Sequence, residues 1–304
     1  MNSEKIMIVY FSGTGGTKLI VDEFKKQFIY DNVDVNIQSL DLDKESSMIK
    51  ESALEVNTVN CLLLLYPVHA FDAPQPVYDW IDALEEGKGQ KVAVISVSGG
   101  GEMWPNTSCR IYAINELEKK GYNIFYENML VMPSNILLAT NLELCKWLIQ
   151  STPDKTKAIA ETIIKGDRHR TKRKHGSVLI KLIADLEKRR AFEFGQGLKS
   201  GDQCDGCNWC VENCPRNNIV LRGGKPIFHN KCIVCMRCVY GCPINAITNE
   251  RFNKFILENG FDIGTIVEET RGAKLVPVMK CTKGIIWLGV RKFLLNKNNG
   301  VKIK

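Results

Sequence analysis

Apolar and polar stretches alternate with two different periods along the first half of the chain. Short, nearly continuous apolar runs predict buried parallel strands, and the segments between them carry apolar residues at helical spacing. The expected strands lie at residues 5–11, 32–40, 59–66, 91–97 and 122–132. The expected helices lie at residues 18–28, 46–56, 74–86, 106–121 and 142–165. This alternation predicts an α/β domain with a doubly wound, five-stranded parallel sheet.

A loop of glycines and hydroxyl side chains joins the first expected strand to the first expected helix. It consists of Ser12, Gly13, Thr14, Gly15, Gly16 and Thr17. Glycines let backbone N–H groups converge on an anion, hydroxyls add donors, and the helix N-terminus adds its dipole. A Walker A loop is excluded because Lys18 follows the threonine, and the dinucleotide fingerprint Gly-x-Gly-x-x-Gly is absent in register. A glycine-rich turn without a ligand is the alternative.

The order Ser-x-Thr-Gly-x-Thr after the first strand resembles the FMN-phosphate loop of flavodoxins. The resemblance implies the strand order 2-1-3-4-5, with the ligand beyond the carboxyl ends of the strands. It also implies that the loops after strands three and four enclose the isoalloxazine ring of FMN. The residues that it assigns to the ring are Pro67, Val68, His69, Ala70, Phe71, Ser98, Gly99, Gly100, Gly101 and Trp104.

The loop after strand three departs from the flavodoxin pattern. Many flavodoxins have a glycine there, whose peptide flips to bond N5 of the reduced flavin. This chain has no glycine between Tyr66 and Pro74, so Ala70 or His69 would supply the carbonyl at greater steric cost. The resemblance therefore does not extend to semiquinone stabilisation. As alternatives, Tyr66 and Trp104 are packing residues and His69 is a hydrogen-bonded loop residue.

Eight of the twelve cysteines repeat one spacing in the second half of the chain. The two runs are Cys204-x-x-Cys207-x-x-Cys210-x-x-x-Cys214-Pro215 and Cys232-x-x-Cys235-x-x-Cys238-x-x-x-Cys242-Pro243. Three closely spaced thiolates suit one iron–sulfur cubane, and in such runs the fourth thiolate ligates the other cluster. We therefore predict two [4Fe–4S] clusters. Their ligands are Cys204, Cys207, Cys210 and Cys242 for cluster 1, and Cys232, Cys235, Cys238 and Cys214 for cluster 2.

This segment is similar to bacterial two-cluster ferredoxins over about fifty residues. A like sequence follows each run, Asn217-Asn218-Ile219 and Asn245-Ala246-Ile247, so the segment is an internal duplication. A zinc ribbon fits less well because it pairs two Cys-x-x-Cys knuckles. Disulfides are disfavoured because the spacing suits a metal core and no secretory signal is recognised. The cysteines outside the pattern are expected to be ordinary thiols; they are Cys61, Cys109, Cys145 and Cys281.

The net charge of +7 is unevenly distributed. Residues 1–164 carry 14 Lys or Arg against 22 Asp or Glu, residues 165–190 carry 10 against 3, and residues 271–304 carry 9 against 0. Apolar residues from 178 onward recur at helical spacing, which predicts an amphipathic helix that packs against the domains. The alternative is a basic docking surface for an acidic redox partner. Nucleic-acid binding is not expected, because no aromatic residues are interleaved with these charges.

These features divide the chain into four parts. We expect a flavodoxin-like FMN-binding domain at 1–165, a basic helical connector at 166–200, a two-cluster ferredoxin domain at 201–250 and a basic extension at 251–304. No run is long enough to span a bilayer and no signal-peptide core is recognised, which favours a cytoplasmic location. Residues 284–295 are expected to pack on the core; a peripheral membrane contact is the less favoured alternative.

Taken together, residues 5–250 resemble fusion proteins in which a flavodoxin-like domain precedes a two-cluster ferredoxin, common among anaerobes. FMN carries two electrons and each cubane carries one, so the resemblance implies an electron-transfer protein. The expected partner is a redox protein such as a ferredoxin, a flavoprotein or a reductase. The alternative is an FMN-dependent reductase of a small organic acceptor or quinone, and a third is a redox-responsive interaction protein. No nicotinamide-binding module is recognised.

Overall fold

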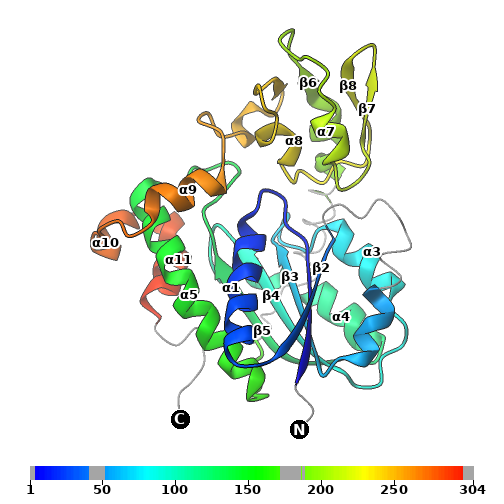
Figure 1. The fold of residues 1–304 in the computed structure, drawn as a ribbon. Coiled ribbons are helices and arrows are strands. Elements are labelled where there is room, and N and C mark those ends of the chain that lie inside the picture. Colours follow the sequence, from blue (N-terminus) through cyan, green and yellow to red (C-terminus); the bar gives the residue numbers. More distant parts are fainter. Residues whose placement is uncertain (1–3, 41–51, 172–185, 187–188, 297–304) are drawn as a thin grey trace.

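The first half of the chain folds around a five-stranded parallel sheet in the computed structural model, which describes residues 4–40, 52–171, 186 and 189–296 (Figure 1). Its strands are β1 (Lys5–Tyr10), β2 (Asp34–Ser39), β3 (Cys61–Pro67), β4 (Lys91–Ser98) and β5 (Asn123–Val131). They lie in the order β2-β1-β3-β4-β5, and each neighbouring pair is parallel. The expected flavodoxin-like order is confirmed, and we refer to this half as the flavodoxin-like domain.

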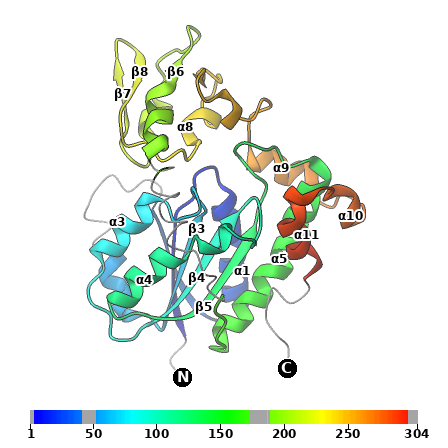
Figure 2. The same ribbon diagram turned by 180° about the vertical axis from the view of Figure 1, so that it is seen from behind.

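Helices cover both faces of the sheet (Figures 1 and 2). They are α1 (Gly16–Tyr30), α3 (Gln75–Ala83), α4 (Ile111–Lys119) and α5 (Leu142–Ile164), with short 3-10 turns η1 (Val56–Thr58) and η2 (Asn106–Ser108). The helices α1 and α5 pack on one face, where Ile6 and Ile8 of β1 are buried. The helices α3 and α4 pack on the other, where Met7 and Val9 are buried. Because successive strand residues face opposite sides, burial of both faces explains the continuous apolar runs.

Two expected helices fall largely outside the described residues. Of the helix expected at 46–56, residues 46–51 are not described, and residues 52–55 are helical. The amphipathic helix expected in the second half of the connector lies mainly within 172–188, of which only residue 186 is described. These two expectations stay predictions.

The start of the connector is attached to the edge of the sheet. His169 forms a parallel bridge with Tyr126 of β5, and its carbonyl accepts from the N–H of Glu127 at 2.8 Å. The Nε of Arg170 lies 2.8 Å from the Glu127 carboxylate. Arg110, which is fully buried, approaches the same carboxylate at 3.3 Å. Such shared pairing offsets the desolvation cost of the buried guanidinium, and it fixes residues 168–171 beside β5.

Eight of the cysteines lie in a small second domain, residues 189–250, which we call the cysteine-rich domain. It sits beyond the carboxyl ends of the parallel strands (Figure 1). Its elements are β6 (Leu198–Ser200), α7 (Trp209–Glu212), β7 (Ile219–Arg222), β8 (Lys225–Phe228), α8 (Arg237–Tyr240) and β9 (Ile247–Asn249). β6 pairs with β9 and β7 with β8, both antiparallel. Since β6 falls within the expected connector range of 166–200, the end of that range is part of this domain's fold.

The C-terminal extension, described over residues 251–296, returns to the flavodoxin-like domain. It contains η3 (Asn253–Phe255), α9 (Ile263–Thr270), α10 (Val278–Cys281), η4 (Ile285–Trp287) and α11 (Leu288–Leu295). It packs along α5 (Figure 2): the Nε1 of Trp147 donates to the carbonyl of Val276 at 2.6 Å, and Val290 is fully buried. Ile285, by contrast, is 88% exposed. Among the described helices, none has both the length and the apolar character that crossing a bilayer requires.

Candidate cofactor sites

The loop between β1 and α1 presents a row of unpaired backbone donors. In the described part of the chain, no acceptor is found for the N–H groups of Gly13, Thr14, Gly15, Gly16 and Thr17. Gly15 has a left-handed φ of 93°, a conformation that glycine adopts without steric cost. Unpaired N–H groups at a helix N-terminus attract anions, and the helix dipole adds to the attraction. The loop therefore has the donor set that a phosphate requires.

Hydroxyl side chains complete this loop. The Oγ of Ser12 accepts from the N–H of Lys18 at 3.3 Å, which ties the loop to α1. The Oγ1 of Thr14 accepts from the Nδ2 of Asn135 at 2.8 Å, so its own O–H is left as a donor. Thr17 is almost completely buried. Sequence reasoning missed Asn135, because one asparagine in the loop after β5 carries no periodic or spacing signal.

The loop after β3 turns sharply without a glycine. Ala70 and Phe71 have φ values of 49° and 62°, both left-handed. The N–H of His69 donates to the carbonyl of Asp72, and the N–H of Asp72 donates back to His69, each at 2.9 Å. Two consecutive left-handed residues form a type I′ turn, which favours asparagine and glycine. Neither residue is glycine, so the turn costs about 1–2 kcal/mol for each of the two.

His69 lies between this turn and the cysteine-rich domain. Its ring meets the ring of Phe11 edge-on, with centroids 6.1 Å apart. Burial lowers the pKa of His69 to about 4, and a hydrogen bond with the backbone of Ile233 acts in the opposite direction. Its Nδ1 is buried and has no hydrogen-bond partner among the described residues. His69 is therefore neutral at pH 7, with one ring nitrogen still unpaired.

The loop after β4 is fixed by hydrogen bonds from its own side chains and by packing against the C-terminal extension. The Oγ of Ser98 accepts from the Nδ2 of Asn106 at 3.1 Å. A Cβ placed on Gly101 would lie 2.6 Å from the backbone of Gly289 in α11, so only glycine allows this approach. Trp104 is 53% exposed and is not a core packing residue. The backbone of this loop is thus fixed while its outer end faces solvent.

The three loops meet at the carboxyl ends of β1, β3 and β4, the edge at which doubly wound sheets bind their ligands. The residues predicted for FMN that lie there are Ser12, Gly13, Thr14, Gly15, Gly16, Thr17, Pro67, Val68, His69, Ala70, Phe71, Ser98, Gly99, Gly100, Gly101 and Trp104. The unpaired N–H groups and the buried Nδ1 of His69 fit a polar, phosphorylated ligand. For FMN, residues 12–17 would hold the phosphate and the other two loops the ring.

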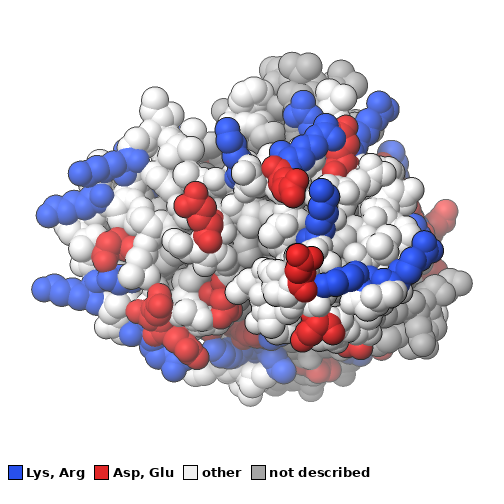
Figure 3. Space-filling view, turned by 90° about the horizontal axis from the view of Figure 1, so that it is seen from above, with Lys and Arg blue, Asp and Glu red and all other residues white. Residues whose placement is uncertain are grey.

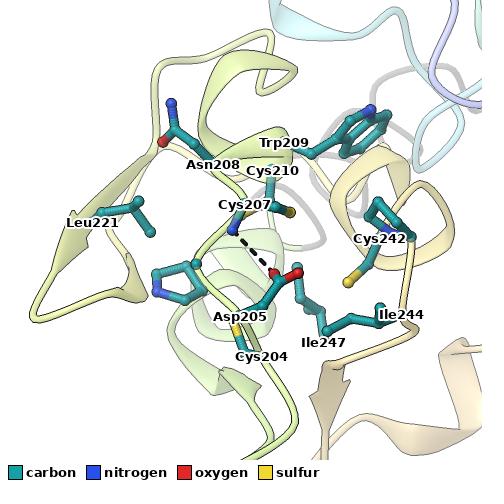
Figure 4. Close-up of a pocket in the computed structure, with 13 residues that line it drawn as sticks. Cys204, Asp205, Cys207, Asn208, Trp209, Cys210, Leu221, Cys242, Ile244 and Ile247 are labelled. Atoms are coloured by element: carbon teal, nitrogen blue, oxygen red, sulfur yellow. Dashed lines mark hydrogen bonds between the residues drawn. The ribbon is translucent and has the colours of Figure 1, made fainter.

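The first predicted set of cysteines lines one cavity, which we call the outer cavity (Figure 4). Its four thiols come from Cys204, Cys207, Cys210 and Cys242. In Figure 4 the sulfur atoms of Cys210 and Cys242 are directed into the space between the labelled side chains. Asp205 also lines the cavity, and its Oδ1 accepts from the N–H of Cys207 at 3.1 Å. Cys207 is exposed, so this cavity opens toward solvent.

The second predicted set lines another cavity, which we call the inner cavity. Its thiols come from Cys214, Cys232, Cys235 and Cys238. Arg216 and Arg237 contribute to its lining, whereas the outer cavity has no Lys or Arg among the residues that line it. Each cavity thus combines three cysteines of one run with the fourth cysteine of the other run, as the spacing predicts for two cubanes.

Electrostatic interactions between thiols connect the two runs. Burial raises the pKa of Cys238 well above its ordinary value, and neighbouring thiols, including Cys214 of the other run, add to the shift. Burial also raises the pKa of Cys210, and Cys242 of the other run is among the thiols that add to it. The raised pKa keeps the Cys238 thiol protonated in the absence of a metal core, so a core has to displace that proton.

The duplicated sequence produces duplicated backbone geometry. Equivalent positions of the two runs have left-handed φ values: Gly206 and Val234 (73° and 54°), Asn208 and Met236 (68° and 62°), Asn217 and Asn245 (47° and 50°). Backbone N–H groups also approach sulfur at equivalent positions, from Asn218 to Cys214 at 3.4 Å and from Ala246 to Cys242 at 3.2 Å. Such N–H···S contacts stabilise thiolates and influence cluster potentials.

The cysteines form no disulfide bonds, and their arrangement bears on the choice between a zinc ion and an iron–sulfur core. All twelve cysteines lie within the described residues, and each is a free thiol. In the same residues, no three His, Cys, Asp or Glu side chains come close enough to share one metal ion. In each cavity four thiols from both runs surround one space, an arrangement that suits a multi-iron core.

Comparison with known proteins agrees with the cysteine geometry. Residues 225–248 match the family described as "4Fe-4S binding domain". The chain joins a flavodoxin-like domain to a 4Fe-4S binding domain. The matched residues include the second cysteine run, so an iron–sulfur cluster in the cysteine-rich domain is supported. No sequence among curated proteins matches the chain.

Solved structures similar to the chain include two flavodoxins. A flavodoxin from the domain Archaea is 16% identical, with a TM-score of 0.36, over 53% of this chain and 99% of its own. Flavodoxin 2 from Bacillus cereus is 18% identical, with a TM-score of 0.38, over 53% of this chain and 98% of its own. Rubredoxin oxygen:oxidoreductase from Desulfovibrio gigas is 12% identical, with a TM-score of 0.39, over 59% of this chain but only 36% of its own. The assignment of the fold rests on the strand order.

The cysteine-rich domain packs directly on the flavodoxin-like domain at the predicted FMN loops. A Cβ placed on Gly13 would lie 2.6 Å from the carbonyl oxygen of Cys235, a cysteine of the inner cavity. Ile233 and Cys235 pack against the apolar core under α3 and α4. Arg216 forms an ion pair with Asp79 of α3. These contacts join residues far apart in the sequence, so no local pattern could have predicted them.

Proposed function

We propose that this protein is an electron-transfer protein that holds FMN at residues 12–17, 67–71 and 98–104 and two [4Fe–4S] clusters in its cysteine cavities. The observation that carries the proposal is the contact of Cys235 with Gly13. It puts the wall of the inner cavity against the predicted phosphate loop. A chain built in this way can exchange electrons internally without a mobile carrier.

The bound groups supply the redox chemistry: FMN connects two-electron with one-electron steps, and each cubane carries a single electron. The residues of the chain bind and orient them. Thiolates from both runs hold the cluster cores, and the unpaired N–H groups of residues 13–17 hold the phosphate. His69, neutral because of its lowered pKa, adds no charge beside the ring. The inner cavity faces the flavodoxin-like domain, because Ile233 and Cys235 of its lining pack on the apolar core of that domain.

The exposure of the two cavities supports a direction of approach for a partner. Cys207 is exposed in the outer cavity, and the inner cavity lies against the flavodoxin-like domain. Electrons are therefore exchanged with a partner at the outer cavity and reach the flavin through the inner cavity. The partner is a redox protein such as a ferredoxin, a flavoprotein or a reductase, and nucleic acid is not among the proposed partners. A cytoplasmic location stays a prediction.

Charge on the exposed face gives a partner mixed contacts. Viewed from the side of the cysteine-rich domain, Lys and Arg side chains project from several edges, with Asp and Glu side chains between them (Figure 3). No large area of one sign is visible among the coloured residues of this face. Dense single-sign faces give strongly salt-dependent association. On this face we therefore expect a moderate dependence of electron-transfer rate on ionic strength.

An FMN-dependent reductase is the second candidate function. It is favoured by the loop after β4, where Trp104 is 53% exposed and leaves the outer end of the predicted ring site accessible. A small organic acceptor or quinone could approach there. Turnover of such an acceptor by the chemically reduced protein, at a rate that saturates with acceptor concentration, would favour this function over transfer to a protein.

Cofactor content after anaerobic purification tests the proposal. We expect about eight irons and one FMN per chain, with the absorbance of both groups. Reduction by a low-potential ferredoxin should then bleach the absorbance of both the clusters and the flavin. About eight irons without flavin, even after addition of FMN, would contradict the flavin part. About four irons would contradict the second cluster.

A further inference from the structure

Arg237 links the cysteine-rich domain to the predicted phosphate loop. It lies in α8 between Cys235 and Cys238, and it lines the inner cavity. Its Nε donates to the carbonyl of Gly13 at 2.9 Å, and its Nη2 donates to the carbonyl of Ser12. These groups are 224 and 225 positions apart in the chain. The guanidinium therefore reaches from one domain into the backbone of the other.

The loop itself supplies no positive side chain. Residues 12–17 are glycine, serine and threonine. Lys18, the nearest cation in sequence, is paired with Asp22 at 2.8 Å, and its side chain is 56% exposed. A phosphate held by the loop would therefore be compensated mainly by N–H groups and the helix dipole. Arg237 adds a permanent charge that the loop sequence lacks.

The two carbonyls that Arg237 contacts belong to the peptides whose N–H groups are unpaired. In a trans peptide the C=O and N–H point in opposite directions. The peptide with the Ser12 carbonyl carries the N–H of Gly13, and the peptide with the Gly13 carbonyl carries the N–H of Thr14. A guanidinium on a carbonyl oxygen polarises the peptide and strengthens its N–H as a donor. Arg237 therefore strengthens the N–H donors that face the anion, while its own side chain stays on the carbonyl side of the loop.

Other contacts from the cysteine-rich domain hold the same loop. The Oη of Tyr240 donates to the carbonyl of Asn135 at 2.9 Å, and Asn135 in turn donates to Thr14 at 2.8 Å. Gly13 is so close to Cys235 that no side chain fits there. The loop conformation is thus shared between the two domains, and Arg237 is the charged member of the contact.

We propose that Arg237 is a positioning residue for the flavin phosphate, supplied to the phosphate loop by the cysteine-rich domain. This inference rests on the proposed FMN site and deepens it. Retention of FMN then depends on correct assembly of the inner cavity, since Arg237 lies between two of its cysteines. By linkage, phosphate binding stabilises the docking of the cysteine-rich domain to the same extent.

The test compares FMN with riboflavin, which has the same ring and no phosphate. Flavin is removed from the anaerobic, cluster-containing protein, and the dissociation constants of both flavins are measured by fluorescence quenching for the wild type, Arg237→Gln and Arg237→Lys. We expect Arg237→Gln to weaken FMN binding about tenfold, the usual scale for a charge-assisted contact. Riboflavin binding should be unchanged, and Arg237→Lys should be intermediate, because lysine keeps the charge but not the fork geometry.

Arg216→Gln is the matched control. Arg216 also lines the inner cavity and pairs with Asp79 across the domain interface, but it makes none of the loop contacts of Arg237. It should leave the ratio of the FMN and riboflavin dissociation constants unchanged. Iron content is measured for every variant, so that loss of the clusters is recognised.

Two results for Arg237→Gln would overturn the inference. Equal loss of FMN and riboflavin affinity in Arg237→Gln would assign Arg237 to packing only, and unchanged FMN affinity would remove any role. If the wild type bound neither flavin, the proposed FMN site would fail on its own. Inorganic phosphate is then the probe: protection of the wild type against thermal unfolding, reduced in Arg237→Gln, would retain an Arg237-dependent anion site, and its absence would overturn that as well.

Discussion

The two cysteine cavities come from one duplicated sequence and have different surroundings. Both contain four thiols in the same spacing and the same left-handed backbone positions. The outer cavity has an exposed cysteine and is lined by Asp205. The inner cavity is lined by Arg216 and Arg237 and contacts the flavodoxin-like domain. The repeated sequence therefore determines how the four thiols are arranged in each cavity. The neighbouring residues determine the charge around that cavity and its exposure to solvent.

Removal of one cysteine from each cavity should give the largest difference between them. Cys238→Ala and Cys207→Ala should each lower iron content by about half, because each removes one ligand of one cluster. Only Cys238→Ala should also weaken FMN binding, by at least about tenfold, because only the inner cavity packs on the phosphate loop. Iron analysis and fluorescence titration measure both effects. Equal loss of FMN affinity in the two variants would show that the cavities do not differ in this way.

Backbone strain offers a second comparison between the repeats. Gly206 and Val234 are equivalent and left-handed, but a Cβ on Gly206 would lie 2.7 Å from the carbonyl oxygen of Gly224. Gly206→Ala should lower the free energy of unfolding by about 2–3 kcal/mol, which combines left-handed strain with this clash. Val234→Ala should change it by about 1 kcal/mol or less, because it removes a branched, half-buried side chain from a strained position. Anaerobic chemical denaturation measures both, and a reversed order would contradict the equivalence.

The domain interface at His69 should make stability depend on pH. The folded pKa of His69 is about 4 and its ordinary value is 6.5, so between these values the unfolded state binds more protons. Stability should therefore fall as pH decreases through this window, by about 2 kcal/mol between pH 7 and pH 5. Denaturation of the wild type and His69→Gln at both pH values measures the effect. His69→Gln should lose less stability on acidification, and an identical loss would assign the pH dependence to other groups.

The smallest expected effect concerns the reduction potentials of the two clusters. The arginines that line the inner cavity should raise the potential of the cluster held there. Arg216→Gln removes a positive charge from the lining of the inner cavity only. Positive charge stabilises the reduced cluster, so the potential of one cluster should fall by about 60 mV, equivalent to about 1.4 kcal/mol for one electron. The other cluster should be unchanged. Redox titration followed by electron paramagnetic resonance resolves the two, and a shift of both by the same amount would contradict the separation.

Much of the fold follows from local patterns. The strands were predictable because burial on both faces gives continuous apolar runs, as at residues 61–67, and each expected strand lies within a few residues of its observed bounds. The grouping of the eight cysteines was predictable because thiolate spacing is dictated by the geometry of a cubane. The glycine-rich loop was predictable for the same kind of reason, since close approach of backbone to an anion requires small residues.

The contacts between the domains could not be read from the sequence. Arg237 is one basic residue within a cysteine run, and only the fold places it on Gly13. Ile263 of α9 lies against Gly15, where a Cβ would be 2.7 Å away, although neither position has a periodic signal for the contact. The turn at Ala70 and Phe71 was also unexpected, because the bridge between its flanking residues overrides the local preference for glycine. Long-range packing decides these features.

Attachment at both ends has a consequence for the cysteine-rich domain. The chain leaves the flavodoxin-like domain beside β5, at His169, and returns to it along α5 through the C-terminal extension. The cysteine-rich domain is thus attached to the flavodoxin-like domain at both of its ends and not through a single linker. Two anchors keep its effective concentration near the docking face at about the millimolar level or higher, and they reduce the entropy of the undocked state. Even a weak interface would then keep the cysteine-rich domain in contact with the flavodoxin-like domain. A partner would therefore bind the two domains as one rigid unit.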